Sequence, residues 1–210
     1  MLTLRHQLEL ETFFLITVTA AASLFFVLRN NSQTQFNVSF KMPVAPIEID
    51  ASSKITTSSQ ISPDGTKKVI MKITKNDDDT STYDFLTADE NNANEQLVFT
   101  KILNSTQNMT IPFNTWSPDN KYFFIQENKG SNKSIFVFNA AGAPFATGET
   151  YLAASDLFKQ KITENNFNEA TGWASETLII INTIKQDNSK GPSYWFEVPS
   201  KAVIQLSTEF

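Results

Sequence analysis

The chain has 210 residues, of which 40% are hydrophobic, and this length suits one domain with a hydrophobic core plus an additional segment. Its formal net charge is −5 and it has no long basic run, which argues against a nucleic acid as partner. It contains no cysteine and a single histidine, His6, so disulfides, thiolate chemistry and histidine-dependent triads or metal sites in the main domain are excluded.

The N-terminal part of the chain is predicted to hold a membrane segment. Residues 13–28 carry no charge and as a helix would be about 24 Å long, near the lower limit for crossing a bilayer. We expect residues 1–29 to be an uncleaved single-pass anchor. The alternatives are a signal peptide cleaved near residues 20–22 and a buried helix of a soluble domain. Arg5 precedes the segment, and Arg29 and Lys41 follow it, a difference too small to decide the orientation. A long polar domain follows the segment, and we expect that domain outside the cytoplasm.

Residues 30–46 have the composition of a tether. They are rich in Asn, Gln and Ser and contain Pro43 and Pro46. Within them Phe36, Val38 and Phe40 alternate with polar residues, a pattern typical of an edge strand. The tether is therefore expected to end by joining the sheet of the domain that follows, residues 47–210.

Residues 47–210 contain a sequence unit that occurs three times. The unit starts at Ile61, at Trp116 and at Trp173, which are 55 and 57 residues apart. A turn follows each of these residues, and an apolar or aromatic run follows each turn. Two further runs, 83–86 and 135–138, come next in the first two units, and 194–198 comes next in the third. These short runs, bounded by turns, predict strands.

The turns explain why the unit has its residue types. Proline suits the second position of a turn, glycine or asparagine suits the fourth, and a serine at the first position can bond back to the chain. The large ring of a tryptophan just before the turn can wedge between neighbouring sheets. The third turn has lost its proline and glycine. The residues that define the motif are Ser62, Pro63, Asp64, Gly65, Trp116, Ser117, Pro118, Asp119 and Trp173.

This unit, a W-S-P-D-G/N turn followed by an apolar run and an aromatic strand, resembles the TolB-like β-propeller repeat. The same repeat occurs in the propeller domains of dipeptidyl peptidase IV and prolyl oligopeptidase relatives. The resemblance covers residues 50–210 and implies an all-β fold of three four-stranded blades, a partial or open propeller, at 47–103, 104–160 and 161–210. Residues 142–168 depart from the pattern and are expected to hold a short helix or an irregular outer strand.

Closed propellers have about four to eight blades, and this chain has only three predicted blades. Two blade faces should therefore stay apolar and uncovered. Two chains could form a six-bladed ring, another protein could complete the ring, the tether strand could cap one end, or an open stack could suffice. We expect a homo-oligomer or a protein partner.

Residues that could carry chemistry have structural interpretations that fit better. Residues 77–79, together with Asp84, lack the spacing of a calcium loop and are expected at a solvated hairpin tip. Asp64, Asp119 and Glu176 recur at equivalent turn positions, which favours turn chemistry over acid–base catalysis. The aromatic run 194–196 favours core packing over sugar stacking, because alternate residues of a strand face opposite sides. No catalytic residue, metal ligand or cofactor is predicted.

Together these features predict a membrane-anchored, non-catalytic, propeller-like module that binds or scaffolds another protein outside the cytoplasm. An alternative is a sensory or gating propeller remnant that works with a separate peptidase-type catalytic chain. A direct activity on a pair of carboxylates, of a glycosidase or lyase, is the third alternative.

Overall fold

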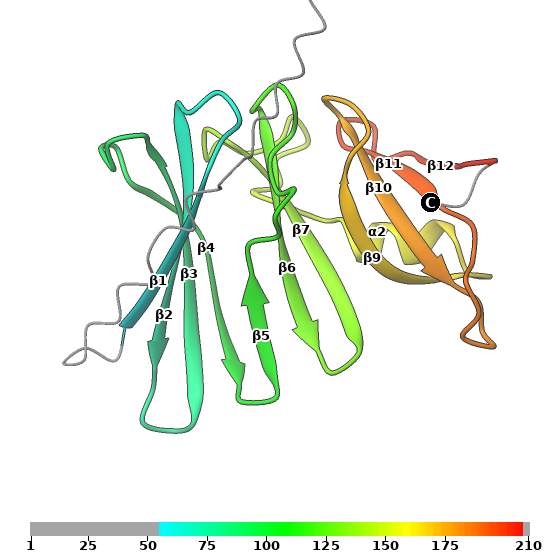
Figure 1. The fold of residues 1–210 in the computed structure, drawn as a ribbon, viewed down its shortest axis with the longest axis horizontal. Coiled ribbons are helices and arrows are strands. Elements are labelled where there is room, and N and C mark those ends of the chain that lie inside the picture. Colours follow the sequence, from blue (N-terminus) through cyan, green and yellow to red (C-terminus); the bar gives the residue numbers. More distant parts are fainter. Residues whose placement is uncertain (1–54, 208–210) are drawn as a thin grey trace, which may run out of the picture. The chain divides into compact units, whose positions relative to one another are not determined.

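The computed structural model describes residues 55–207, which form three four-stranded antiparallel sheets and one helix (Figure 1). The predicted all-β class is confirmed for this part of the chain. The predicted anchor, residues 1–29, and the predicted tether, residues 30–46, lie outside the described residues. Among residues 55–207, no helix is both long enough and apolar enough to cross a membrane.

The three sheets follow one another along the chain, and the strands of each sheet are neighbours in chain order. We call them the first, middle and last sheet. The first sheet consists of β1 (Ile55–Ile61), β2 (Lys67–Lys75), β3 (Thr80–Asp89) and β4 (Gln96–Asn104). The middle sheet consists of β5 (Gln107–Thr110), β6 (Tyr122–Lys129), β7 (Asn132–Asn139) and β8 (Leu152–Ala153). The last sheet consists of β9 (Asn166–Trp173), β10 (Leu178–Ile184), β11 (Tyr194–Glu197) and β12 (Val203–Gln205).

The apolar and aromatic runs for which strands were predicted do form strands. The run after each of the three turns forms β2, β6 and β10, and the next run forms β3, β7 and β11. The segment that departs from the pattern, residues 142–168, contains the two-residue strand β8 and the helix α2 (Ala154–Lys161), as expected. Asp156 lies in the first turn of α2 and Lys159 and Lys161 in its last turn, which complements the helix dipole.

The middle sheet buries both of its faces. Phe123 and Phe124 are neighbours in β6, so their side chains point to opposite faces, and both are fully buried. Phe123 belongs to a core shared with the first sheet, whereas Phe124 belongs to a core shared with the last sheet. A strand buried on both faces needs a continuous apolar run, which explains the sequence Tyr122–Ile125.

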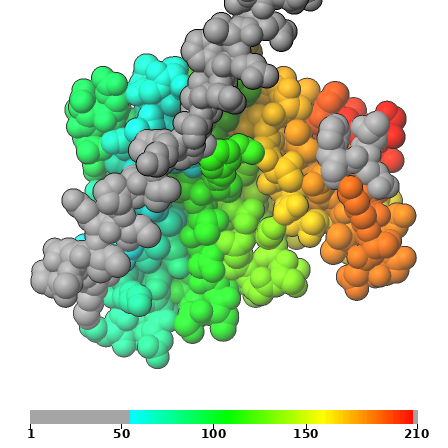
Figure 2. Space-filling view, in the orientation of Figure 1, coloured from blue at the N-terminus to red at the C-terminus, as the bar shows by residue number. Residues whose placement is uncertain are grey.

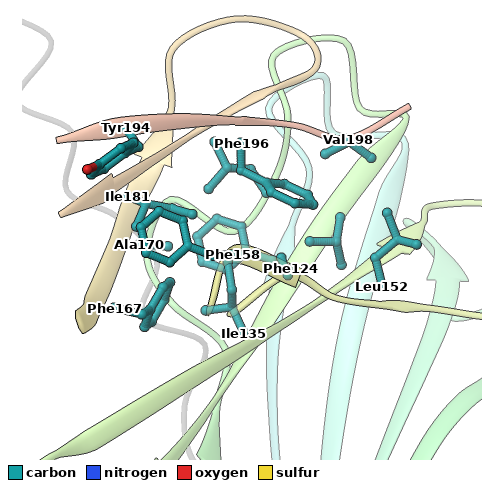
Figure 3. Close-up of a cluster of buried hydrophobic side chains, with 13 residues drawn as sticks. Phe124, Ile135, Leu152, Phe158, Phe167, Ala170, Ile181, Tyr194, Phe196 and Val198 are labelled. Atoms are coloured by element: carbon teal, nitrogen blue, oxygen red, sulfur yellow. The ribbon is translucent and has the colours of Figure 1, made fainter. Parts of the chain in front are cut away.

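Two separate hydrophobic cores therefore hold the three sheets together. The core between the first and middle sheets contains Val69, Met71, Tyr83, Phe85, Leu103, Met109, Trp116, Phe123, Ile125, Phe136, Phe138 and Ala140. The core between the middle and last sheets contains Phe124, Ile135, Val137, Leu152, Ala154, Phe158, Phe167, Ala170, Ile179, Ile181, Tyr194, Phe196 and Val198 (Figure 3). Within the second core, Phe158 of α2 packs edge-on against Tyr194, with their ring centroids 5.1 Å apart.

We predict that truncating a core ring of the middle sheet destabilises the whole domain. Phe123→Ala should lower the free energy of unfolding by about 3–5 kcal/mol, because it leaves a cavity between two sheets. The control is Phe113→Ala, which removes a ring that is 63% exposed and should change stability by about 0.5 kcal/mol or less. Urea unfolding followed by circular dichroism measures both variants. Equal losses would contradict the two-sided role of β6.

Candidate interaction faces

The first two motif turns share one hydrogen-bonding pattern. In the first turn the Ser62 hydroxyl donates to Asp64 Oδ1 at 2.6 Å and accepts from the Lys67 amide at 3.0 Å. In the second turn the Ser117 hydroxyl donates to Asp119 Oδ1 at 2.8 Å and accepts from the Tyr122 amide at 3.0 Å. Both serines are buried, whereas the prolines that follow them, Pro63 and Pro118, are exposed.

The fourth position of each turn needs a left-handed backbone. Gly65 has φ 78° and Asn120 has φ 58°, and the amide of each donates to the carbonyl of its turn serine at 2.9 Å. Asparagine tolerates this region better than most residues, so Asn120 can stand in for glycine. The third turn is one residue shorter, because the Ala174 amide bonds the Leu178 carbonyl four residues ahead instead of five.

The turn carboxylates are held as acceptors. The hydrogen bond from the Ser62 hydroxyl, followed by the bond from the Thr66 amide, lowers the pKa of Asp64. Burial raises the pKa of Asp119, but hydrogen bonds from Lys121 and Ser117 outweigh it, so the net shift of that pKa is downward. Lys121 Nζ lies 2.9 Å from Asp119 Oδ2. These roles are structural, and Asp64 and Asp119 lie on different turns.

The two motif tryptophans join neighbouring sheets at equivalent places. Trp116 Nε1 donates to the Gln60 carbonyl at 3.3 Å, and Trp173 Nε1 donates to the Thr115 carbonyl at 3.1 Å. Gln60 and Thr115 each lie two residues before the first residue of a motif turn. Each tryptophan therefore reaches back to the same position of the preceding sheet. We call this contact a seam hydrogen bond; the first unit has Ile61 in place of the tryptophan.

We call the contact region between two neighbouring sheets a seam. A second polar contact lies at the seam between the middle and last sheets. Asn114 Nδ2 donates to the Thr171 carbonyl at 3.0 Å. Gly172, the next residue, has φ 140°, and a Cβ there would lie 2.9 Å from the Asn114 Cβ. Glycine is thus required where β9 passes the side chain of Asn114, which lies in the loop between β5 and β6.

The other candidate sites have local partners. Asp78 Oδ1 accepts from the Thr80 hydroxyl at 2.6 Å, and this bond and the bond from the Thr80 amide lower the pKa of Asp78. Residues 77–79 lie between β2 and β3, where the sequence predicted a hairpin tip. Within residues 55–207, no cluster of three or more histidine or acidic side chains is placed to hold a metal ion.

A shallow hollow beside α2 holds a carboxylate that is already engaged. Glu149, Tyr151 and Asp156 are among the residues that line the hollow. Lys201 Nζ lies 2.6 Å from Glu149 Oε1, and this contact, together with a hydrogen bond from the Thr147 hydroxyl, lowers the pKa of Glu149 to about 2. Because the hollow is open and its Glu149 carboxylate is paired, we do not regard it as a reaction centre.

The run 194–196 splits between two faces, as the sequence predicted. Tyr194 and Phe196 are buried in the core between the middle and last sheets, as Figure 3 shows. Trp195 points to the opposite face, where it pairs across the sheet with Ile180 and Ile204. The Trp195 indole nitrogen is buried and has no hydrogen-bond partner in the described part of the chain.

The outward face of the first sheet collects exposed apolar side chains. Seven large hydrophobic residues are exposed among residues 55–207, and four of them lie here. Ile102 is 62% exposed and Leu97 is 56% exposed. The strand register places all four opposite to the core-facing Val69 and Met71. We define the first end face by Ile55, Ile61, Ile70, Leu86, Leu97 and Ile102, of which Ile70 is already buried and Leu86 is half-buried.

The outward face of the last sheet is also apolar. Ile180, Trp195 and Ile204 form one row across β10, β11 and β12. Ile204 is 45% exposed and the other two side chains are half-buried. We define the last end face by Leu178, Ile180, Ile184, Trp195 and Ile204. Figure 2 shows the three sheets in the same order, with the first and last sheets at the two ends of the described part.

Sequence reasoning expected two uncovered apolar blade faces but named no residue on them. The available signal was in β1, where Ile55 and Ile61 stand among polar residues. The acceptors of the seam hydrogen bonds are backbone carbonyls and have no sequence signal.

No protein-family model matches the chain, and no curated protein matches it. The resemblance to the TolB-like repeat therefore rests on the motif turns and the runs that follow them.

Acidification should weaken the domain partly through the two motif turns. The folded-state pKa of Asp64 and that of Asp119 are lowered, so their stabilisation is present above the unfolded value of about 3.9 and is lost as the pH falls through the folded values. The double variant Asp64→Asn/Asp119→Asn should be less stable at pH 7 and should show a shallower fall below about pH 5. Urea unfolding between pH 3 and 7 measures this, and parallel curves for both proteins would contradict it.

Removal of one indole N–H from a seam should cost about as much as one buried hydrogen bond. Trp116→Phe and Trp173→Phe should each lower the free energy of unfolding by about 1 kcal/mol or more, because each removes an indole hydrogen bond and ring volume. Tyr122→Phe is the control, since it removes a polar group but keeps a ring that stacks on Trp173. Thermal unfolding compares the three, and a larger loss in the control would argue against the seam bonds.

Proposed function

We propose that this chain is a non-catalytic, propeller-like module that is anchored in the cell membrane and binds another protein outside the cytoplasm. The observation that carries the proposal is the pair of apolar end faces. Each internal face of the three sheets is covered by a neighbouring sheet, and the equivalent faces at the two ends carry exposed isoleucine and leucine. Apolar surface of this kind is typical of protein–protein contact.

The propeller-like architecture is part of the proposal. Three four-stranded antiparallel sheets, each following the previous one along the chain, fit blades of a propeller. The motif turns lie between the first and second strand of each sheet, so the three units occupy equivalent places. The blade ranges 47–103, 104–160 and 161–210 and the TolB-like resemblance support this interpretation.

The membrane and non-catalytic parts of the proposal rest on the sequence. The uncharged segment 13–28 supports an anchor, and the long polar domain after it supports a location outside the cytoplasm. The chemistry of the described residues supports a binding role, since the candidate carboxylates serve turns, hairpin tips and ion pairs.

The full chain should be recovered from detergent-solubilised membranes together with a protein partner in fixed stoichiometry. Ile102→Glu should lose that partner, because it places an unpaired charge on the first end face. The matched control Asn132→Glu adds the same charge at the exposed end of β7 and should keep the partner. Tagged protein, crosslinked before solubilisation, is weighed by light scattering. A protein mass of 23.6 kDa, that of one chain, in every preparation would contradict the proposal.

A further inference from the structure

We infer that the partner is a second copy of this chain, and that two copies close a ring of six sheets. In this ring the last end face of each chain packs on the first end face of the other. The inference rests on the proposed function, because it names the protein that the module binds. Two chains of three sheets supply six blades, within the about four to eight blades of closed propellers.

The first argument comes from the two seams inside the chain. Both seams join the same two kinds of face. One kind faces the following sheet and carries Val69 in the first sheet and Phe124 in the middle sheet. The other kind faces the preceding sheet and carries Phe123 in the middle sheet and Ile179 in the last sheet. Each seam therefore pairs unlike faces in a fixed direction along the chain.

Each end face is of one of these two kinds, but no other sheet of the described residues packs on it. Counted from the turn bonds of Lys67, Tyr122 and Leu178, Ile180 occupies the position of Val69 and Phe124. The last end face is thus a face that normally covers a following sheet. By the same count Ile70, on the first end face, occupies the position of Ile125, which is fully buried against the preceding sheet. One copy offers both kinds, so a second copy satisfies both ends at once.

The second argument is the chemistry of the two faces. Four of the seven exposed large apolar side chains of the described residues lie on the first end face. The last end face presents a matching row, Ile180, Trp195 and Ile204, with a buried indole N–H that has no acceptor in residues 55–207. Because that nitrogen is already buried within one copy, the exposed apolar side chains, and not the indole N–H, are what a partner would cover.

The unlike pairing predicts a head-to-tail arrangement rather than a symmetric contact of two equal faces. A head-to-tail contact builds a ring when the rotation closes and a filament when it does not. In a two-chain ring the same junction occurs twice. Each junction brings Ile61 of one copy to the place where Trp116 and Trp173 stand inside the chain, so it lacks a seam hydrogen bond and should be weaker than the internal seams.

The missing tryptophan allows a gain-of-function test. Ile61→Trp should supply an indole N–H to the Gly172 carbonyl of the second copy, the position equivalent to Gln60 and Thr115. Because each of the two junctions gains one such hydrogen bond, worth about fivefold, the dimer should be about 25-fold tighter. Sedimentation equilibrium of the full chain in density-matched detergent measures the dissociation constant. An unchanged or weaker dimer would count against the proposed junction.

A charge-pair experiment tests the direction of the junction. Ile204→Glu alters only the last end face and Leu97→Lys alters only the first, and each should weaken the dimer about tenfold or more by placing an unpaired charge in both junctions. When the two variants are mixed, the mixed dimer has one junction of opposite charges and one wild-type junction. Mixing should therefore give a tighter dimer than either variant forms alone.

The remaining outcomes each contradict the inference in a distinct way. If only one of the two variants loses the dimer, the contact joins two equal faces and the ring is wrong. If both variants stay dimeric, the copies associate elsewhere, such as through the predicted anchor, and the inference fails. If the wild type is monomeric but binds a different protein that Ile102→Glu releases, the inference fails and the proposed function stands. Circular dichroism of each variant establishes that its sheets are folded.

Discussion

The fold depends on one constraint, that the middle sheet has no solvent-facing side. Its two long strands carry apolar side chains on both faces, and those of 123–125 and 135–138 are buried against a different sheet on each side. Such a sheet cannot be stable alone, because one uncovered face would expose several aromatic rings to water. The first and last sheets are thus held in place by hydrophobic packing against the two faces of the middle sheet. Neither core contains residues from all three sheets.

A direction follows from the seam hydrogen bonds. Trp116 and Trp173 both reach back to a carbonyl of the preceding sheet, and Ile61 cannot do so. This direction makes the two ends of the described part different, although both carry an apolar face. The first end lacks a tryptophan, whereas the last end has a carbonyl at the acceptor position, Gly172. Any partner that continues the stack is therefore expected to meet two different surfaces.

Much of the architecture could be predicted from the sequence because it depends on local signals. The Ser-Pro-Asp turns and the apolar runs after them predicted β2, β6 and the strands that follow. For the irregular segment, the sequence predicted a short helix or an outer strand, and the structure has both, α2 and β8. The serine-to-aspartate bonds are also local, spanning two residues. Each of these features lies within a stretch of chain short enough for turn and strand chemistry to decide it.

The rest could not be predicted because it depends on contacts between distant strands. A bulge between Phe85 and Leu86 shifts the register of β3 and β4, and this shift decides that Leu97 faces outward. The pairing of Trp116 with a carbonyl 56 residues earlier is set by how two sheets pack. A continuous apolar run such as that in β6 predicts burial but does not say which sheet covers which face.

Native-state hydrogen exchange of the full chain, followed by mass spectrometry, tests the central constraint most directly. If the middle sheet is stabilised from both sides, the amides of β6 and β7 exchange most slowly and only when the whole domain unfolds. The outer strands β1 and β12 should exchange faster through local opening. Fast exchange in β6 and β7, with slower exchange in an end sheet, would contradict the account, because an end sheet would then hold its structure without the middle one.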